Sequence, residues 1–236
     1  MSHRVLVPLE LPDADSVPAA LAKSITSMEV VLLGHYGLPE QTPPSAARDQ
    51  FGDDARAELT TLAESFEDAE ASVTTRVVFG KARDKTINRV AVEEECDVIL
   101  TSGDADEITQ VLVPIRGERN FDRILSFSEE LLTATEATVT LFHMGEDSDQ
   151  IPGEEILSDA TDQLIQAGID SDRITQRLSE DDDTTQTIID LAESFDALIL
   201  GETEPSLRDQ ILGNVPAQVT IDTDNPAFVV RDAEEA

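Results

Sequence analysis

The chain has 236 residues, of which 50 are acidic, 16 are lysine or arginine, and 40% are hydrophobic. That hydrophobic fraction is enough for a packed core, so the formal net charge of −34 does not indicate a disordered acidic tail. Only three of the basic residues are lysine. This balance is typical of a halophile, because in molar salt a Debye length of about 3 Å screens the repulsion between carboxylates.

Charge and hydropathy also exclude some partners. Both halves of the chain are net negative, so neither offers a basic surface to nucleic acid. No apolar run approaches the ~20 residues of a membrane helix, and residues 1–10 lack the layout of a signal peptide. We therefore expect no nucleic-acid partner, no membrane insertion and a cytoplasmic location. The lone cysteine, Cys96, has no neighbouring histidine or basic cluster, so we expect a buried hydrophobic residue rather than a thiolate.

The first part of the chain alternates short apolar runs with segments of helical period. Strands are expected at residues 5–9, 30–34, 73–79 and 98–102, with helices between them, and the proline-rich segment 36–46 is expected to be a loop. Only six residues separate Gly103 from Gln110, too few for another helix and strand. The first part of the chain therefore ends after its fourth strand, without a further helix and strand.

The second part begins the same alternation again and carries it further. Asn120 is the candidate N-cap of its first helix, and Gly168 is the candidate C-cap of its second. An alternating order of strands and helices is typical of a parallel sheet covered on both faces. Strands are expected at residues 111–114, 137–143, 173–178, 197–200 and 228–231, and helices at about 121–132, 154–167, 184–194 and 206–219.

Two short motifs recur along the chain. Val5-Leu6-Val7-Pro8 returns at residues 111–114, and Asp97-Val98-Ile99-Leu100 is echoed at residues 196–200. We interpret the chain as two copies of one unit. Residues 1–108 form a truncated lobe without the last helix and strand, and residues 109–236 form a full lobe.

This layout, with the segment 197–215 (ALILGETEPSLRDQILGNV) and the ending at 226–231 (PAFVVR), resembles the universal stress protein (UspA-like) family over nearly the whole chain. The resemblance implies an α/β fold of two tandem lobes, each a doubly wound parallel sheet of the adenine-nucleotide alpha hydrolase-like type with strand order 3-2-1-4-5, the first lobe being truncated. Many members bind ATP or AMP and others have lost the binding motif. The family is regulatory more than catalytic.

The resemblance places a candidate nucleotide site in the second lobe, at the topological switch point between its first and fourth strands. The family's glycine loop reads G-x-x-G-x9-G-(S/T). Gly201 and Gly213 match its first and third glycines, but Glu204 replaces the second, the following spacing is one residue short, and Asn214 replaces the Ser/Thr. Arg116 stands where the family has an aspartate that holds the nucleoside. The candidate binding residues are Arg116, Gly201, Glu204, Gly213, Asn214 and Val215.

The chemistry of this site leaves three alternatives open. A carboxylate at Glu204 repels phosphates, which argues against a bound triphosphate. Arg116 either binds an anion, or pairs with Glu202 or Glu204 and seals an empty cleft, or serves another ligand. In the first lobe Glu10 keeps the family's acid, but residues 103–106 are too few for the loop, so no binding is expected there.

Other catalytic and metal motifs are not found. The sequence contains no G-x-G-x-x-G, no P-loop and no G-x-S-x-G, and His3, His35 and His143 are too far apart to form a local ligand pair. His35 and His143 each end the second strand of a lobe, for which a structural role is favoured over a metal or pH-sensing role. We assign no catalytic residue, no metal ligand and no required cofactor.

The family often dimerises by pairing fifth strands, but this chain has one fifth strand for two lobes. Either the lobes pack as an internal pseudo-dimer, or two chains pair through Phe228, Val229 and Val230, and we expect both. The function that we expect is a regulatory or interaction protein that is not an enzyme. The alternative is an adenine-nucleotide sensor for ATP or AMP that uses the second lobe. A nucleotide hydrolase is disfavoured because no base and metal can be placed.

Overall fold

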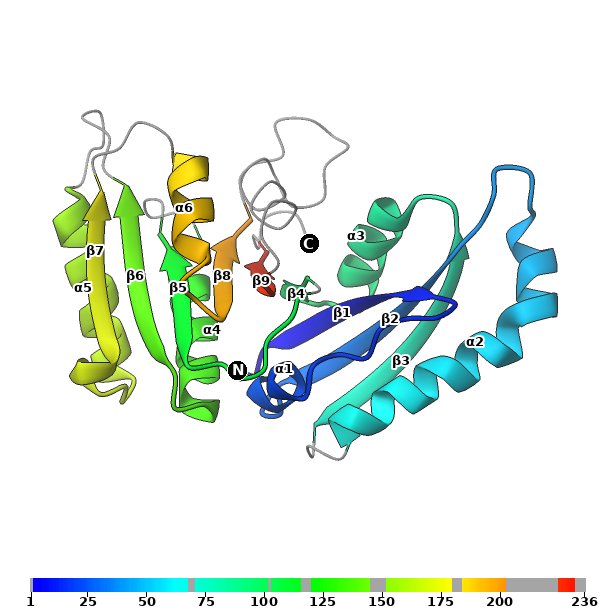
Figure 1. The fold of residues 1–236 in the computed structure, drawn as a ribbon, viewed down its shortest axis with the longest axis horizontal. Helices are drawn as coiled ribbons and strands as arrows, with labels where there is room; N and C mark the ends of the chain where they lie inside the picture. The colour runs from blue at the N-terminus through cyan, green and yellow to red at the C-terminus, as the bar shows by residue number, and fades with distance from the viewer. Residues whose placement is uncertain are drawn as a thin grey trace.

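One continuous β-sheet runs through the molecule, with helices on both of its faces (Figure 1). The computed structural model describes residues 2–67, 71–101, 103–115, 120–144, 152–179, 184–202 and 225–231. Within these residues the elements are β1 (Arg4–Leu11), α1 (Ala19–Ser24), β2 (Glu29–Gly37), α2 (Pro44–Glu67), β3 (Ser72–Gly80), α3 (Arg83–Glu93), β4 (Val98–Leu100), β5 (Gln110–Pro114), α4 (Phe121–Ala134), β6 (Thr138–Met144), α5 (Gly153–Gln166), a 3-10 turn (Ser171–Arg173), β7 (Ile174–Ser179), α6 (Thr184–Ala192), β8 (Ala197–Gly201) and β9 (Ala227–Val230).

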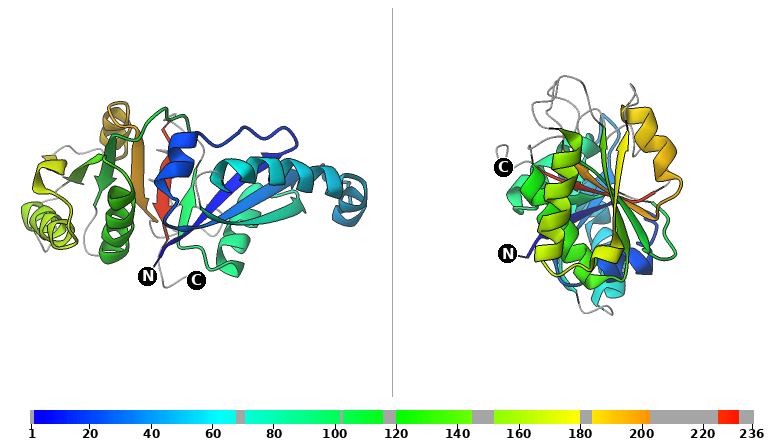
Figure 2. Two further views of the ribbon diagram at one scale, coloured as in Figure 1. Left: turned by 90° about the horizontal axis from the view of Figure 1, so that it is seen from below. Right: turned by 90° about the vertical axis from the view of Figure 1, so that its left-hand side faces the viewer.

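The nine strands follow the order β3-β2-β1-β4-β9-β8-β5-β6-β7. Every neighbouring pair is parallel except β4 and β9, which are antiparallel. The expected α/β fold with a mostly parallel sheet is confirmed. The strong twist of the sheet, visible in Figure 2, is the normal right-handed twist accumulated over many strands.

The core follows from the alternation of side chains along each strand. Val5 and Val7 of β1 belong to a large apolar cluster that α1, α2, α4 and α5 cover, whereas Leu6 between them packs against α3. In β5 the outer valines join the same large cluster, and Leu112 packs against α6. Because both faces are covered, these strands are continuous apolar runs rather than alternating polar and apolar ones.

Most predicted elements are found, with ends moved by a few residues. The loop expected over residues 36–46 is shorter, because β2 continues to Gly37 and α2 begins at Pro44. Proline is well suited to the first turn of a helix, where its missing N–H costs no hydrogen bond. The helix expected over 206–219 lies outside the described residues. Between Gly103 and β5 the chain forms no helix or strand, as expected.

The two predicted helix caps have different outcomes. Gly168 follows the end of α5 with a φ of +100°, a conformation that favours glycine, so its expected role is confirmed. Asn120 does stand at the N-cap position of α4, but it makes no capping hydrogen bond. Its backbone is left-handed, with a φ of 59°, and its Nδ2 donates to the carbonyl of Val230 at 2.9 Å. The predicted N-cap position of Asn120 is confirmed, but its side chain ties α4 to β9 and does not cap the first turn.

β9 is an inner strand of the sheet. It pairs in parallel with β8 through Phe228↔Ile199 and antiparallel with β4 through Val230↔Val98. Phe228, Val229 and Val230 are each 0% exposed. The expected homodimer contact through these three residues is therefore wrong, because β4 of the same chain occupies the edge that a second chain would need. The division into lobes 1–108 and 109–236 stays a prediction.

Cys96 lies on the α3 side of the sheet and is 3% exposed, as expected for a core residue. Burial, as the main cause, raises the pKa of its thiol to about 12. We expect iodoacetamide at about pH 8 to leave Cys96 unmodified in the native chain, because so little thiolate forms. Mass spectrometry before and after unfolding in guanidinium measures this. Native-state alkylation at the rate of the unfolded chain would contradict it.

Candidate functional site

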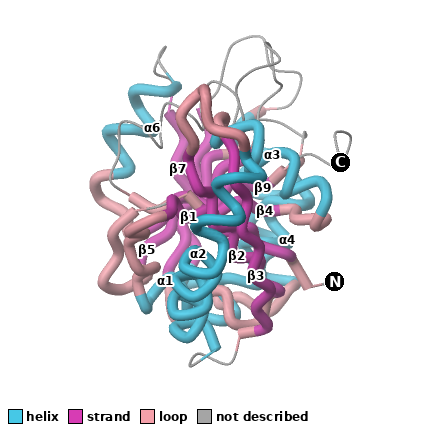
Figure 3. Tube along the Cα trace, turned by 90° about the vertical axis from the view of Figure 1, so that its right-hand side faces the viewer, coloured by secondary structure: helices cyan, strands magenta, loops and turns pink. Residues whose placement is uncertain are grey.

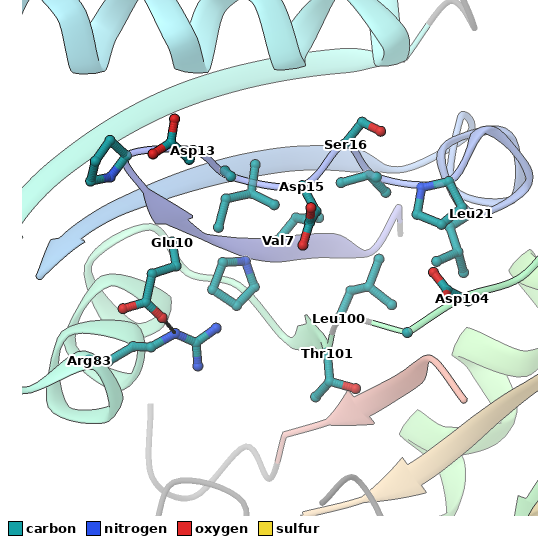
Figure 4. Close-up of a pocket in the computed structure, with 17 residues that line it drawn as sticks. Val7, Glu10, Asp13, Asp15, Ser16, Leu21, Arg83, Leu100, Thr101 and Asp104 are labelled. Atoms are coloured by element: carbon teal, nitrogen blue, oxygen red, sulfur yellow. Dashed lines mark ion pairs between the residues drawn. The ribbon is translucent and has the colours of Figure 1, made fainter. Parts of the chain in front are cut away.

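A cleft of about 770 Å³ opens at the carboxyl ends of β1 and β4 (Figure 4). The two strands are parallel neighbours, with β2 on the far side of β1 and β9 on the far side of β4. Open α/β sheets bind ligands at such a point, where the strand order reverses. The lining residues come from the end of β1, the following loop, the start of α3 and the segment after β4: Val7, Pro8, Leu9, Glu10, Pro12, Asp13, Ala14, Asp15, Ser16, Val17, Pro18, Leu21, Arg83, Leu100, Thr101, Gly103 and Asp104.

The loop between β1 and α1 forms one wall of the cleft. It begins with a cis peptide bond between Leu11 and Pro12, and Asp13 follows with a φ of 67°. The backbone N–H of Ala14 donates to Glu58 Oε1 of α2 at 2.9 Å. α2 packs along β2 and β3 (Figure 3), so this wall is anchored to a long helix.

The segment after β4 forms the opposite wall and is fixed to β9. The backbone N–H of Thr101 donates to the carbonyl of Ala227 at 2.8 Å, and the N–H of Ala227 donates to Thr101 Oγ1 at 3.1 Å. A Cβ added to Gly103 would lie 2.3 Å from the backbone nitrogen of Pro226. Only glycine permits this approach of two backbones. The short loop at 103–106 therefore packs on the start of β9.

The cleft is acidic. Four carboxylates line it, from Glu10, Asp13, Asp15 and Asp104, against one guanidinium, from Arg83. Arg83 Nε lies 3.5 Å from Glu10 Oε2, the ion pair drawn in Figure 4. Because both side chains are well exposed, the pair adds little stability. The excess of negative charge disfavours phosphates.

His35 lies on β2 opposite Glu10. It is 1% exposed, and neither ring nitrogen has a hydrogen-bond partner within the described structure. Burial is the main cause that lowers the pKa of His35. Glu10 and Asp84 raise this pKa and Arg83 lowers it, and the net shift is downward, so the ring is neutral. His143, on β6, is equally buried, and its Nδ1 lies 2.8 Å from the carbonyl of Ile115.

Of the residues proposed from the sequence for nucleotide binding, the structure describes Gly201. It ends β8, next to β5, and a Cβ there would lie 2.8 Å from Ile124 Cδ1, so the glycine lets α4 approach the strand end. Glu202, an expected partner of Arg116, has its Oε2 4.0 Å from Arg231 Nε. The other candidates lie outside the described residues: Arg116, Glu204, Gly213, Asn214 and Val215.

The sequence did not anticipate a cleft in the first part of the chain, because the short loop at 103–106 indicated no phosphate site there. A signal was available in the segment 11–18 (LPDADSVP), whose two prolines separate β1 from α1. Within the described part of the chain, no group of three or more His, Cys, Asp or Glu side chains is placed to hold a metal ion. No described helix is long and apolar enough to cross a bilayer.

No protein-family model matches the sequence, and no curated protein matches it. Solved structures do match the fold. A universal stress protein from Archaeoglobus fulgidus DSM 4304 is 15% identical, with a TM-score of 0.67 over 98% of both chains. A protein assigned to the universal stress proteins from Pseudomonas aeruginosa UCBPP-PA14 is also 15% identical, with a TM-score of 0.58 over 99% of this chain and 94% of that one. A universal stress protein in complex with cAMP is 21% identical over 55% of this chain and all of its own, with a TM-score of 0.45. The chain therefore has the fold of the universal stress proteins.

Proposed function

We propose that this chain is a regulatory or interaction protein built on the universal stress protein fold, and that it is not an enzyme. The observation that carries the proposal is the composition of the cleft between β1 and β4. The described residues that line it include no histidine, cysteine or lysine, and its one arginine is paired with Glu10. Such a lining suits ligand binding better than acid–base or nucleophilic chemistry.

The charge of the cleft indicates which ligands it favours. Asp104 stands in the segment where the family's fold would hold phosphates, and Gly103 is packed against Pro226 instead of being free to cradle an anion. A phosphate near Asp104 would meet an unfavourable charge even in molar salt, because groups in contact are screened least. We infer that this cleft takes uncharged or positively charged small molecules.

A second candidate function is an adenine-nucleotide sensor for ATP or AMP that uses residues 109–236. The observation in its favour is that β5 and β8 are parallel neighbours whose carboxyl ends form a second switch point, with Gly201 at the end of β8. Arg116 is the residue that we propose to hold the anion. The acidic composition supports a cytoplasmic location in a halophile under either function.

Calorimetric titration of ATP, ADP and AMP into the full chain in molar KCl tests the proposal. We expect no saturable heat with any of the three, because the described cleft repels phosphates. Arg116→Ala and Asp104→Asn are the matched variants, since each changes the charge of one candidate site only.

Two results would contradict the proposal in different ways. Saturable binding that is lost in Arg116→Ala would support the sensor. Binding that survives Arg116→Ala but tightens in Asp104→Asn would place the nucleotide between β1 and β4. The melting temperature of each variant without ligand serves as the control for correct folding.

A further inference from the structure

A row of three hydrogen-bonded side chains lies where the N-terminal segment, the start of β4 and helix α4 meet. His3 Nδ1 is hydrogen-bonded to Asp97 Oδ2, and His3 Nε2 lies 3.1 Å from Ser126 Oγ. A serine, an imidazole and a carboxylate in this order are the groups by which serine hydrolases activate their nucleophile. The three residues are far apart in sequence, and no motif joins them.

The imidazole is held in the orientation that this chemistry requires. Asp97 Oδ1 accepts the backbone N–H of Arg4 at 2.8 Å. Burial raises the pKa of Asp97, but the hydrogen bonds from His3 and from Arg4 outweigh it and lower the pKa overall, so the carboxylate stays ionised. It then accepts a hydrogen bond from Nδ1–H of His3, and in this tautomer the lone pair of Nε2 faces Ser126.

Two further contacts fix His3. Its backbone N–H donates to Glu130 Oε2 at 3.1 Å, and its ring meets Phe127 edge-on at 5.5 Å between centroids. His3 is 7% exposed, whereas Ser126 is an exposed residue of α4. A small molecule therefore reaches the hydroxyl while the base behind it is shielded from water.

Ser65 on α2 shows what an ordinary exposed helical serine does in this chain. Its Oγ donates to the carbonyl of Leu62, one turn earlier, at 2.8 Å. Ser65 is exposed like Ser126, but its hydroxyl is bonded to its own helix and not to an imidazole. The two serines therefore form a matched pair, because both are exposed on a helix but only Ser126 has an imidazole beside its hydroxyl.

We propose that Ser126 is an acylation site that takes an acyl group from small activated donors such as aryl esters and thioesters, a covalent modification separate from ligand binding in the cleft. Ser126 Oγ attacks the acyl carbon while its proton passes to His3 Nε2. The bond between the acyl carbon and the leaving group breaks, and the leaving group departs with the bonding electron pair. The proton then passes from His3 to the leaving group or to solvent.

The helix restricts this chemistry to activated donors. Ser126 lies within α4, where backbone N–H groups are used in helical hydrogen bonds and are not directed at an incoming oxyanion. Loss of such donors costs hydrolases about 10²–10³ in rate. We therefore expect one acyl group per chain, transferred from donors with good leaving groups and hydrolysed slowly, rather than rapid turnover.

Reaction of the full chain with p-nitrophenyl acetate in molar KCl tests the proposal. We expect a burst of one nitrophenolate per chain, and peptide mass spectrometry should find acetyl on Ser126 at a rate about 100-fold above Ser65, the lower part of the range for general-base assistance. Ser126→Ala should abolish the burst and Ser65→Ala should leave it unchanged. His3→Gln should lower the rate at Ser126 to that of Ser65.

Equal acetylation rates at Ser126 and Ser65 in the unmodified chain would overturn the proposal, and this comparison needs no variant to fold. A burst that persists in Ser126→Ala would overturn it as well. So would an unchanged rate at Ser126 in a His3→Gln chain with native circular dichroism. None of these outcomes depends on whether a nucleotide binds.

Discussion

Replacing Gly103 with alanine is expected to lower the free energy of unfolding by about 3 kcal/mol, near the upper end for overpacked sites. The new Cβ would lie 2.3 Å from the nitrogen and 2.7 Å from the Cα of Pro226, and 2.5 Å from the carbonyl carbon of Asn225. These are backbone atoms of the two residues just before β9, so no side-chain rotation relieves the clash. Urea unfolding in molar KCl, followed by circular dichroism, measures the change.

Gly52→Ala is the control for this variant. Gly52 lies inside α2, and a Cβ there would be 3.3 Å from a guanidinium nitrogen of Arg56 and 3.6 Å from Cγ of Arg48. Both are parts of flexible side chains, and alanine favours a helix interior over glycine by about 1 kcal/mol. The two substitutions should change stability in opposite directions. Equal stability of Gly103→Ala and the unmodified chain would mean that residue 103 is not packed on β9.

Replacing Asp196 with asparagine is expected to destabilise the chain by about 2 kcal/mol at neutral pH, the value for charge-assisted hydrogen bonds at a partly exposed site. Oδ2 of Asp196 accepts three hydrogen bonds, from the backbone N–H and Oγ1 of Thr109 and from the N–H of Gln110, at 2.7–2.9 Å. These bonds tie the start of β8 to the start of β5. A neutral amide accepts them more weakly.

The same contacts make stability depend on pH. Burial raises the pKa of Asp196, but its hydrogen bonds to Thr109 and Gln110 outweigh this and lower it below the ordinary 3.8. The folded state then holds fewer protons than the unfolded state, so the contribution is complete above about pH 4 and is lost as the pH falls through the folded-state pKa. The difference in melting temperature between Asp196→Asn and the unmodified chain should therefore shrink on acidification.

Asp190→Asn serves as the control for Asp196. Asp190 is an exposed residue of α6 that accepts one hydrogen bond, from Gln186 Nε2 at 2.7 Å. Its replacement should change stability by less than about 0.5 kcal/mol. A pH-independent difference between Asp196→Asn and the unmodified chain would show that the carboxylate charge is not what ties β8 to β5.

Local signals in the sequence predicted the elements of this fold well. The apolar runs at β1 and β5 and the stripe of α4 depend on residues a few positions apart, which periodicity detects. The sequence also showed that aspartate recurs at positions 97 and 196, but it did not show what these two side chains do. In the structure each aspartate accepts backbone N–H groups at the start of the neighbouring strand, at Arg4 and at Gln110.

The contacts that the sequence did not predict join distant parts of the chain. Periodicity identified 228–231 as a strand but gave no information on which strand would pair with its second edge. The cleft was missed because its walls come from separate segments, and its geometry depends on how Gly103 meets Pro226. The row of His3, Asp97 and Ser126 was hidden for the same reason, since His3 and Ser126 are 123 positions apart.

The inner position of β9 has a consequence for synthesis on the ribosome. β4 leaves the ribosome early, yet its partner across the hydrogen bonds of Thr101 and Ala227 is 126 positions further along the chain. The edge of β4 therefore stays uncovered until β9 has been translated. Long-range pairing of this kind slows folding and leaves an open edge exposed to other nascent chains. The synthesis of β9 thus decides when the edge of β4 becomes protected from aggregation.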